Sequence, residues 1–479
     1  MKNKTIYILS ILLLTSILTH CTDPWDDHVN DGVTNVNQSL LQRLESEANA
    51  TVFLDLLKTS GLDKNLDGRN AYTVFAPTNE SIQSLVTSLK TDPEALETFV
   101  QNHIAVSTHR LNTGSDTVQI TMLNGKILDL VNSQIGGVAF AKANQGSADG
   151  LYHVINTPLM PQQNLWEFIN SNTDYAQNQF VLSLNTYNLL DTAAGQDDPE
   201  DEYLNNEFLH NLADVRVEKD RFTYFVLNNA TFEQEVNGFL PYVNYRNEAD
   251  SSLAISRYHI VKDLIFAQAY DLESLPDQLV SISGVQFPID KNAIVETIPL
   301  SNGYIHVLNT STLPVANRLL DLVIEGEDFT GTTSSVSNST FVREKMDPSG
   351  NIFRDLMIQN HGVSALGVRY ALPYLLSTNY DVYWRAVNDI QTNVFQQRVV
   401  MTDINMVEDE FGVLRYPTFQ EFPYMNVEVR NYNEVYLGEF ELAELKRVNA
   451  FLTGAAVTTN GNNTIVADYL RFVPKVKQN

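Results

Sequence analysis

Cysteine is nearly absent from this sequence. The 479 residues include only Cys21, so no disulfide can form within the chain and no cluster of thiolates can hold a metal ion. Basic residues are also scarce, because 31 lysines and arginines stand against 58 acidic residues and give a formal net charge of −27. Such a chain repels nucleic-acid phosphates, which argues against a nucleic-acid partner. The composition, 43% hydrophobic, leaves ample material for packed cores, and a chain of this length predicts about three domains.

A hydrophobic run near the N-terminus is too short to cross a bilayer. It extends over 13 positions from Ile6 to Leu18, and Lys2 and Lys4 precede it. Because a transmembrane helix needs about 20 apolar residues, the pattern is instead typical of a secretory signal peptide. We expect residues 1–20 to be that signal peptide.

The signal peptide ends beside the single cysteine. The run Leu18-Thr-His-Cys21 resembles the bacterial lipobox, whose cysteine is lipidated, although His20 departs from the small residue that this pattern prefers. The resemblance implies a lipid anchor on Cys21, an outer-membrane, cell-surface location and a tether over residues 21–36; the alternative is an ordinary cleaved signal with an incidental cysteine. The acidic cluster Thr22–Asp27 resembles the export tag of surface lipoproteins of the Bacteroidota, and an acidic linker is the alternative.

One sequence pattern occurs twice in the chain. Asp149–Pro161 and Asn302–Pro314 share Gly, His, Val, Asn, Thr and Pro at matching positions, and His306 lies 306 − 153 = 153 residues after His153. An offset of about domain size indicates a duplicated domain. We therefore divide the chain into a first repeat (37–161), a second repeat (162–316) and a C-terminal region (317–479).

The first repeat is predicted to have helices first and a mostly antiparallel sheet second. Apolar residues at three- and four-residue steps in Leu40–Leu44 favour an amphipathic helix. Tyr72–Ala76 alternates like a strand, and Thr78 or Asn79 can cap the helix after it. Asn124-Gly125 lies between two apolar runs, which is a strong hairpin signal. This order predicts an α+β fold.

Two motifs of the first repeat resemble the signature boxes of the fasciclin (FAS1) domain. They are Tyr72-Thr-Val-Phe-Ala-Pro-Thr-Asn79 and Gly150-Leu-Tyr-His-Val-Ile-Asn156. The second repeat carries related motifs but departs from the family at Val226-Leu227, where the first has Ala76-Pro77. The resemblance implies two α+β fasciclin-like domains in tandem. Fasciclin domains widely mediate adhesion.

Each repeat carries two histidines that invite a catalytic or metal-binding interpretation. All four stand beside large apolar residues, which is more typical of a buried histidine that hydrogen-bonds to the backbone. We expect a structural role for the four: His103, His153, His259 and His306.

The C-terminal region contains short alternating runs that predict a mostly-β, jelly-roll-like sandwich. Its clearest strand is Tyr380-Asp-Val-Tyr-Trp-Arg-Ala386. Together with Ile324–Phe329 and Ala467–Phe472, this strand resembles those of galactose-binding-like jelly rolls, including carbohydrate-binding modules. Such modules often hold a structural calcium ion, and the resemblance places its ligands at Glu325, Glu327 and Asp468. The alternative is that these are simply solvent-facing carboxylates.

Aromatic residues gather in one segment of the C-terminal region. Arg415–Tyr424 carries four aromatics and two prolines without periodicity, so we expect a loop at the end of the sandwich. Exposed rings stack on sugar faces at little entropic cost, which makes this segment the candidate ligand-binding site; the alternative is that the rings only pack the loop. The four candidates are Tyr416, Phe419, Phe422 and Tyr424.

No catalytic motif that we can recognise occurs in the sequence. We therefore expect a cell-surface lipoprotein for adhesion or ligand binding that needs no cofactor apart from the predicted calcium. Similar lipoproteins of the Bacteroidota accompany SusC/SusD-type nutrient transporters, so such a complex and a glycan are the expected partners. The alternative is a surface glycan hydrolase with catalytic carboxylates in or near the C-terminal sandwich.

Overall fold

The fold is taken from a computed structural model that describes residues 37–66, 68–111, 116–189, 202–459 and 461–477. The predicted signal peptide, Cys21 and the tether lie outside these residues. The chain forms two compact units, one built around the first repeat and the other containing most of the second repeat with the C-terminal region. Among the described residues, no helix is long and apolar enough to cross a membrane.

The first repeat begins with helices whose buried side chains form one core cluster with strand residues such as Val74 and Tyr152. Ser39 starts the first helix with a capping box, because its hydroxyl accepts from the Gln42 N–H and the Gln42 side chain accepts from the Ser39 N–H. Thr78 begins α5 without a side-chain hydrogen bond, and Asn79 instead accepts from the N–H of Val52, so the predicted cap is not formed. The helices are α3 (Leu40–Glu45), α4 (Thr51–Ser60), α5 (Asn79–Ile82), α6 (Val86–Thr91) and α7 (Pro93–Gln101).

Seven strands of the first repeat form one sheet in the order β2-β1-β7-β6-β5-β4-β3. The predicted hairpin is confirmed: Thr121 pairs with Ile127 across the turn, and Gly125 adopts the left-handed backbone (φ 82°) that favours glycine. The strands are β1 (Tyr72–Pro77), β2 (Ile104–Ala105), β3 (Val118–Thr121), β4 (Ile127–Val131), β5 (Gln134–Ile135), β6 (Val138–Gly146) and β7 (Gly150–Ile155).

The second repeat has an extended set of helices around a smaller sheet, whose order is β11-β10-β15-β14. Its helices are α8 (Leu165–Ser171), α9 (Ala176–Ser183), α10 (Glu207–Asn211), α11 (Asn229–Phe239), α12 (Ala249–Lys262) and α13 (Val315–Arg318). Its strands are β8 (Asn185–Leu189), β9 (Glu202–Asn206), β10 (Phe222–Leu227), β11 (Ile265–Phe266), β12 (Gln278–Val280), β13 (Gln286–Pro288), β14 (Ile294–Leu300) and β15 (Gly303–Leu308).

The duplicated motifs form the same parallel strand pair in both repeats. Strand β1 pairs with β7 so that Phe75 faces His153, and β10 pairs with β15 so that Phe225 faces His306. The shared glycine begins the second strand of each pair. A Cβ on Gly303 would lie 1.8 Å from a carbonyl oxygen of β10, so the strands approach closely enough to require glycine there.

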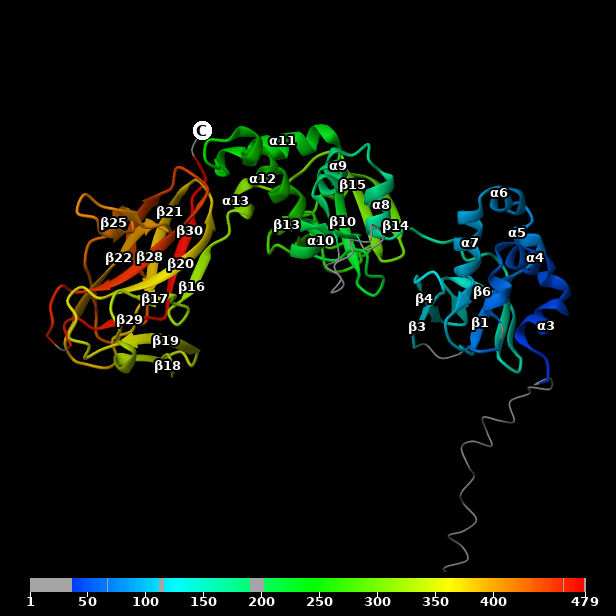
Figure 1. The fold of residues 1–479 in the computed structure, drawn as a ribbon, viewed down its shortest axis with the longest axis horizontal. Helices are drawn as coiled ribbons and strands as arrows, with labels where there is room; N and C mark the ends of the chain where they lie inside the picture. The colour runs from blue at the N-terminus through cyan, green and yellow to red at the C-terminus, as the bar shows by residue number, and fades with distance from the viewer. Residues whose placement is uncertain (1–36, 67, 112–115, 190–201, 460, 478–479) are drawn as a thin grey trace, which may run out of the picture. The chain divides into compact units, whose positions relative to one another are not determined.

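The C-terminal region is largely β and contains two main antiparallel sheets (Figure 1). One has the order β16-β30-β21-β27, and the other has the order β17-β20-β28-β22-β25 with β26 also paired to β22. The main-sheet strands are β16 (Leu322–Glu325), β17 (Gly331–Thr332), β20 (Gly367–Leu375), β21 (Asn379–Arg385), β22 (Phe395–Asp403), β25 (Thr418–Glu421), β26 (Met425–Val427), β27 (Val435–Glu441), β28 (Lys446–Gly454) and β30 (Tyr469–Pro474). Smaller sheets contain β18 (Thr340–Met346), β19 (Ile352–Ile358), β23 (Val407–Glu408), β24 (Leu414–Arg415) and β29 (Ile465–Ala467).

The sandwich core consists of alternate residues from facing strands. In β21, Tyr380, Val382 and Trp384 are buried while their neighbours are partly exposed, as the sequence predicted. Trp384 is 1% exposed and is among the largest fully buried side chains of the chain. The hairpin β18–β19 was not predicted, because three consecutive charged residues, Arg343–Lys345, interrupt the apolar pattern of β18.

Backbone hydrogen bonds attach the sandwich to the second repeat. The N–H of Leu445 donates to the Asn244 carbonyl at 2.7 Å, and the N–H of Ser377 donates to the Tyr242 carbonyl at 2.8 Å. The side chain of Asn244 also donates to the Ala443 carbonyl at 3.0 Å. Buried backbone groups are thus paired across the junction, which fixes the segment that follows Tyr242 against the sandwich.

Candidate functional site

The six-stranded sheet of the sandwich has an outer face that is rich in polar and aromatic side chains. In β28, Val448, Ala450 and Leu452 belong to the core. The residues that alternate with them, including Arg447 and Phe451, therefore point to the outer face. Two cavities lie on this face of the sheet.

The first cavity contains Tyr416, one of the four predicted ligand-binding residues. It has a volume of about 400 Å³ and is lined by Gly331, Thr332, Thr333, Arg369, Met406, Tyr416 and Phe451. The ring of Tyr416 lies 5.6 Å from the ring of Phe451, centroid to centroid, and the Arg369 guanidinium lies 5.8 Å from the centre of the Tyr416 ring. The cavity therefore combines an aromatic floor with hydroxyl and guanidinium donors.

Arg369 is held in place by neutral groups. It donates to the Tyr416 hydroxyl at 2.5 Å, to the Thr330 hydroxyl at 3.1 Å and to the Thr330 carbonyl at 3.3 Å. None of these acceptors is a carboxylate, so the guanidinium keeps its charge uncompensated beside the cavity. A fixed planar donor of this kind suits recognition of sugar oxygens.

The other three predicted residues have different surroundings. Phe419 is 41% exposed, and its ring lies 4.1 Å from the Lys446 ammonium. Tyr424 packs beneath the Arg398 guanidinium at 4.8 Å, and its hydroxyl donates to the Gly454 carbonyl. Phe422 is 2% exposed in the sandwich core, so its prediction as a binding residue is wrong.

A glycine explains why Phe422 is buried. A Cβ on Gly438 would lie 3.1 Å from the Phe422 ring, and Gly438 has a φ of 142° beside the irregular pairing of β21 with β27. The missing side chain opens the space that the ring fills. The expected loop is also partly ordered as a strand, because Thr418–Glu421 forms β25 and pairs with β22.

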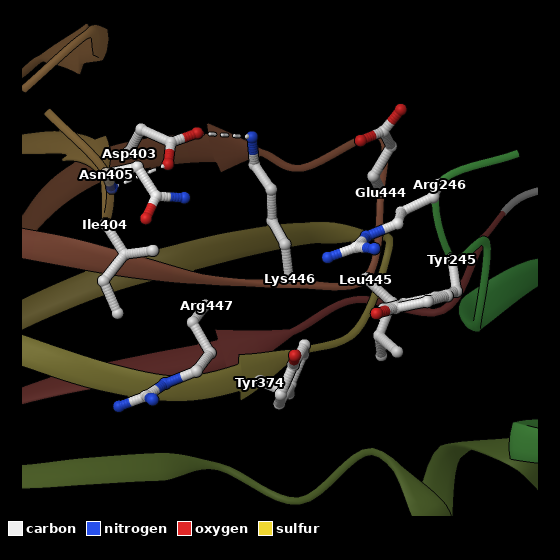
Figure 2. Close-up of a pocket in the computed structure, with 10 residues that line it drawn as sticks. All are labelled: Tyr245, Arg246, Tyr374, Asp403, Ile404, Asn405, Glu444, Leu445, Lys446 and Arg447. Carbon is white, nitrogen blue, oxygen red and sulfur yellow. Dashed lines mark hydrogen bonds and ion pairs between the residues drawn. The ribbon is translucent and has the colours of Figure 1, made fainter. Parts of the chain in front are cut away.

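The second cavity lies where the second repeat meets the sandwich, and it has a volume of about 430 Å³. Figure 2 shows Arg246 extending from the second repeat toward Lys446 and Tyr374, while Lys446 turns to Asp403. The Lys446–Asp403 ion pair has a length of 3.1 Å. Although burial acts in the opposite direction, hydrogen bonds from the Asn405 N–H and Lys446 lower the pKa of Asp403 overall. This carboxylate is therefore ionised and already neutralised by a partner.

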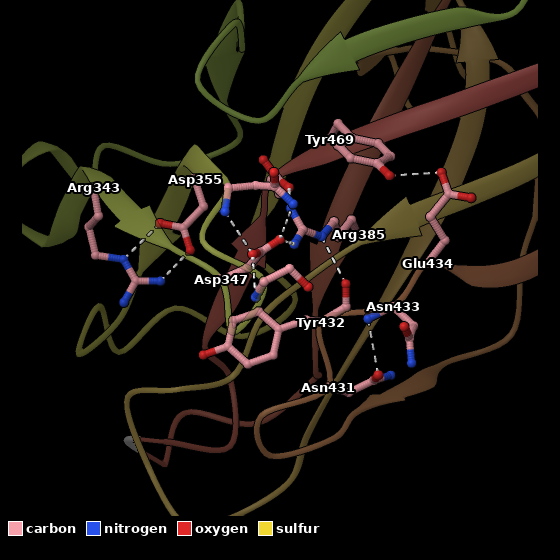
Figure 3. Close-up of polar contacts among 12 residues, drawn as sticks. Arg343, Asp347, Asp355, Arg385, Asn431, Tyr432, Asn433, Glu434 and Tyr469 are labelled. Carbon is pink, nitrogen blue, oxygen red and sulfur yellow. Dashed lines mark hydrogen bonds and ion pairs between the residues drawn. The ribbon is translucent and has the colours of Figure 1, made fainter.

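Arginines and carboxylates form a network of ion pairs in the sandwich, and Figure 3 shows Arg343 bound to Asp355 and Arg385 beside Asp347. Arg385 donates to Asp468 at 2.6 Å and forms an ion pair with Asp347 at 3.2 Å. Burial raises the pKa of Asp468 while the Arg385 guanidinium opposes that shift. Glu327 has an ion pair with Arg354 at 3.5 Å.

The three predicted calcium ligands are close enough for their charges to act on one another. Among the described residues, no three histidine, cysteine, aspartate or glutamate side chains are arranged to hold a metal ion. Burial and the neighbouring carboxylates of Asp468 and Glu327 raise the pKa of Glu325. Arg385 supplies a positive charge at Asp468, and the calcium ion stays a prediction.

The four repeated histidines have the structural surroundings that we expected, and three of them hydrogen-bond to the backbone. His103 accepts from the Leu159 N–H at 2.9 Å and donates to the Phe99 carbonyl at 2.7 Å. His153 and His306 each hydrogen-bond to a backbone carbonyl at 3.0 Å. His259 instead packs on Phe239, with ring centroids 5.1 Å apart.

Sequence reasoning missed Arg369, Phe451, Arg246 and Arg447. The alternation of Val368, Tyr370 and Leu372 in β20 could have placed Arg369 on the outer face, because its neighbours are apolar. No local signal places Arg246 beside a strand that lies two hundred residues further along the chain.

Comparison with known proteins identifies one domain. Residues 48–161 match the family model of the Fasciclin domain, so this part of the chain is a fasciclin domain. Stabilin-1 of Mus musculus is 28% identical over 160 residues, which cover 29% of this chain. The match spans only 6% of the length of Stabilin-1.

Two solved structures are similar to longer or different parts of the chain. A FAS1 domain pair from the insect cell adhesion molecule Fasciclin I is 16% identical, with 56% of this chain and 96% of that chain covered and a TM-score of 0.22. The C-terminal CBM6 of LamC from Zobellia galactanivorans is 12% identical, with 32% of this chain and 99% of that chain covered and a TM-score of 0.20. At these TM-scores neither similarity bears on function.

Proposed function

We propose that this protein binds carbohydrate at a cell surface, through the cavity beside Tyr416. The observation that carries this proposal is the arrangement of Tyr416, Phe451 and Arg369 on the outer face of the sheet. Sugar rings have one apolar face and a rim of hydroxyl groups. An aromatic floor with a fixed guanidinium and two threonines at its edge matches both features.

The location and partners belong to the same proposal. Lipidation of Cys21 would anchor the chain in the outer membrane of a Bacteroidota cell, since a multiply acylated cysteine binds membranes persistently. The second repeat would serve as a second fasciclin-like domain, and its strand register, equal to that of the first, supports this assignment. An accessory role beside a SusC/SusD-type transporter follows from the lipoprotein pattern, and copurification of such a transporter from native membranes would test it.

The binding site is tested with the full chain by affinity electrophoresis in gels that contain soluble polysaccharides. We expect retardation in at least one neutral polysaccharide and about tenfold weaker binding for Tyr416→Ala, since a lost stacking contact is worth about 1.4 kcal/mol. Tyr436→Ala is the matched control, because this tyrosine is 48% exposed and lies on the other sheet. Equal loss in both variants, or no retardation by any polysaccharide, would contradict the proposal.

The hydrolase alternative has no specific observation in its favour. Inverting and retaining glycosidases both need two carboxyl groups across one cleft. No aspartate or glutamate is among the residues that line the cavity beside Tyr416. The two carboxylates at the second cavity, Asp403 and Glu444, are each bound by another side chain.

A further inference from the structure

The cavity in Figure 2 has a basic lining although the chain carries a net charge of −27. Three cationic side chains line it, Arg246, Lys446 and Arg447, against the two carboxylates Asp403 and Glu444. Asp403 pairs with Lys446, and Glu444 accepts a hydrogen bond from the neutral amide of Asn247 and keeps its charge. The lining therefore carries a net charge of 3 − 2 = +1, and the positive charge in excess is presented by the two arginines.

Neither arginine has an ion-pair partner within the part of the chain that the structure describes. Arg246 lies 5.0 Å above the ring of Tyr245, which holds its side chain without reducing its charge. Arg447 is exposed at the start of β28. A guanidinium presents a planar fork of donors that matches the two oxygens of a carboxylate or a sulfate ester.

The backbone that presents Arg246 is unusual. Arg246 and Asn247 both adopt left-handed conformations, with φ of 50° and 57°. Such conformations are costly for an arginine and persist only where the surroundings impose them. The hydrogen bonds of Asn244 to the sandwich and of Asn247 to Glu444 at 3.1 Å impose them here. The junction thereby holds a charged side chain at the edge of the sandwich in a fixed position.

The two cavities lie along one strand of the same sheet face. Arg447 and Phe451 both point outward from β28, and four residues of an extended strand span about 13 Å. Asp403, Ile404 and Asn405 line the basic cavity, and Met406 lines the cavity beside Tyr416. A short sugar chain could thus lie over this segment and reach both cavities.

We propose that the basic cavity binds the acid groups of an anionic polysaccharide, a uronate carboxylate or a sulfate ester, while the Tyr416 cavity holds a sugar ring of the same chain. This assignment rests on the proposed carbohydrate-binding function and specifies its ligand class. The ring of Tyr374, 56% exposed and 6.5 Å from that of Tyr245, offers a sugar contact inside the basic cavity. At physiological salt the Debye length is about 8 Å, so the repulsion between the acid groups of the ligand and distant acidic residues of the chain is largely screened. Direct contacts between those acid groups and the two arginines are screened much less.

The test measures binding of the full chain by isothermal titration calorimetry to dextran and dextran sulfate, and to galactan and polygalacturonate. Each pair includes one neutral and one charged polymer, and the sulfate and uronate arms separate the two sources of charge. We expect a charged polymer to bind at least tenfold more tightly than its neutral counterpart. Arg447→Gln and Arg246→Gln should each reduce that preference about tenfold.

Arg415→Gln is the control, because this arginine is exposed, is paired with Asp409 and is not among the residues that line either cavity. Melting temperatures of all variants should match that of the parent protein. Equal affinity for charged and neutral polymers, with Tyr416→Ala still weakening both, would overturn the anionic assignment and leave the proposed function standing. Binding of no polysaccharide would overturn both, and binding of poly-glutamate in their place would assign the cavity to an acidic protein partner.

Discussion

The first repeat should lose stability in mild acid, because two of its buried histidines must remain neutral. Burial lowers the pKa of both His103 and His153 to about 4. The hydrogen bonds show why a second proton is excluded. One ring nitrogen of His103 accepts from the Leu159 N–H, and one ring nitrogen of His153 accepts from the Asn144 N–H. If such an accepting nitrogen were protonated, its N–H would point at the backbone N–H and the hydrogen bond would be lost.

The sign follows from proton uptake. Between pH 6.5 and about 4 the unfolded chain binds protons at these histidines and the folded chain does not, so stability is present above this window and is lost as the pH falls through it. At pH 5 the linkage costs about 2 kcal/mol for each histidine, or about 4 kcal/mol together. This is a large part of the ~5–15 kcal/mol that usually stabilises a domain.

Nuclear magnetic resonance of the histidine rings and urea unfolding at pH 7.5 and pH 5.0 measure the effect. The folded-state signals of His103 and His153 should titrate near pH 4, with the proton on Nδ1 in His103 and on Nε2 in His153. The unfolding transition of the first repeat should move to lower urea at pH 5.0. A ring that titrates near 6.5 in the folded protein, or a transition unchanged between the two pH values, would refute the reasoning.

Three further outcomes follow from the structure. Gly303→Ala should unfold the second repeat and leave the first repeat near the parent stability, as two separate transitions in calorimetry would show, because its Cβ would overlap the Phe222 carbonyl. Arg318→Met should destabilise the second repeat by about 3–5 kcal/mol in urea unfolding, since Asp263 and Glu235 would lose the buried guanidinium that binds both. Cys21→Ala should abolish labelling by a palmitate analogue and release the protein from membranes; persistent labelling would exclude this anchor.

Local patterns predicted much of the fold. The alternation in β21 and the Asn124-Gly125 turn depend on neighbouring residues, so the sequence alone identifies them. The repeated motif predicted a duplicated unit, and the structure adds that Phe75 faces His153 as Phe225 faces His306. The alternation and the turn are set by neighbouring residues and the repeat by duplication, so each can be identified without knowledge of distant contacts.

The candidate site depended on contacts that no local pattern records. Phe422 has the sequence surroundings of an exposed ring, yet it fills a space that Gly438 leaves open on a different strand. Asp468 has the position of a calcium ligand, yet Arg385 neutralises it. Arg246 acquires its place in the basic cavity from a left-handed backbone that the sandwich imposes on it. Burial and charge balance at these positions are set by partners far away in the chain.

The position of β30 has a consequence for the order in which the protein can fold during synthesis and export. This strand lies between β16 and β21, so the four-stranded sheet is incomplete until residue 474 has emerged. The sheet of the first repeat is complete by residue 155. Until β30 arrives, β16 and β21 have unpaired backbone edges, which invite aggregation and proteolysis. We expect chaperones and proteases that bind the emerging chain to act chiefly on the incompletely folded sandwich.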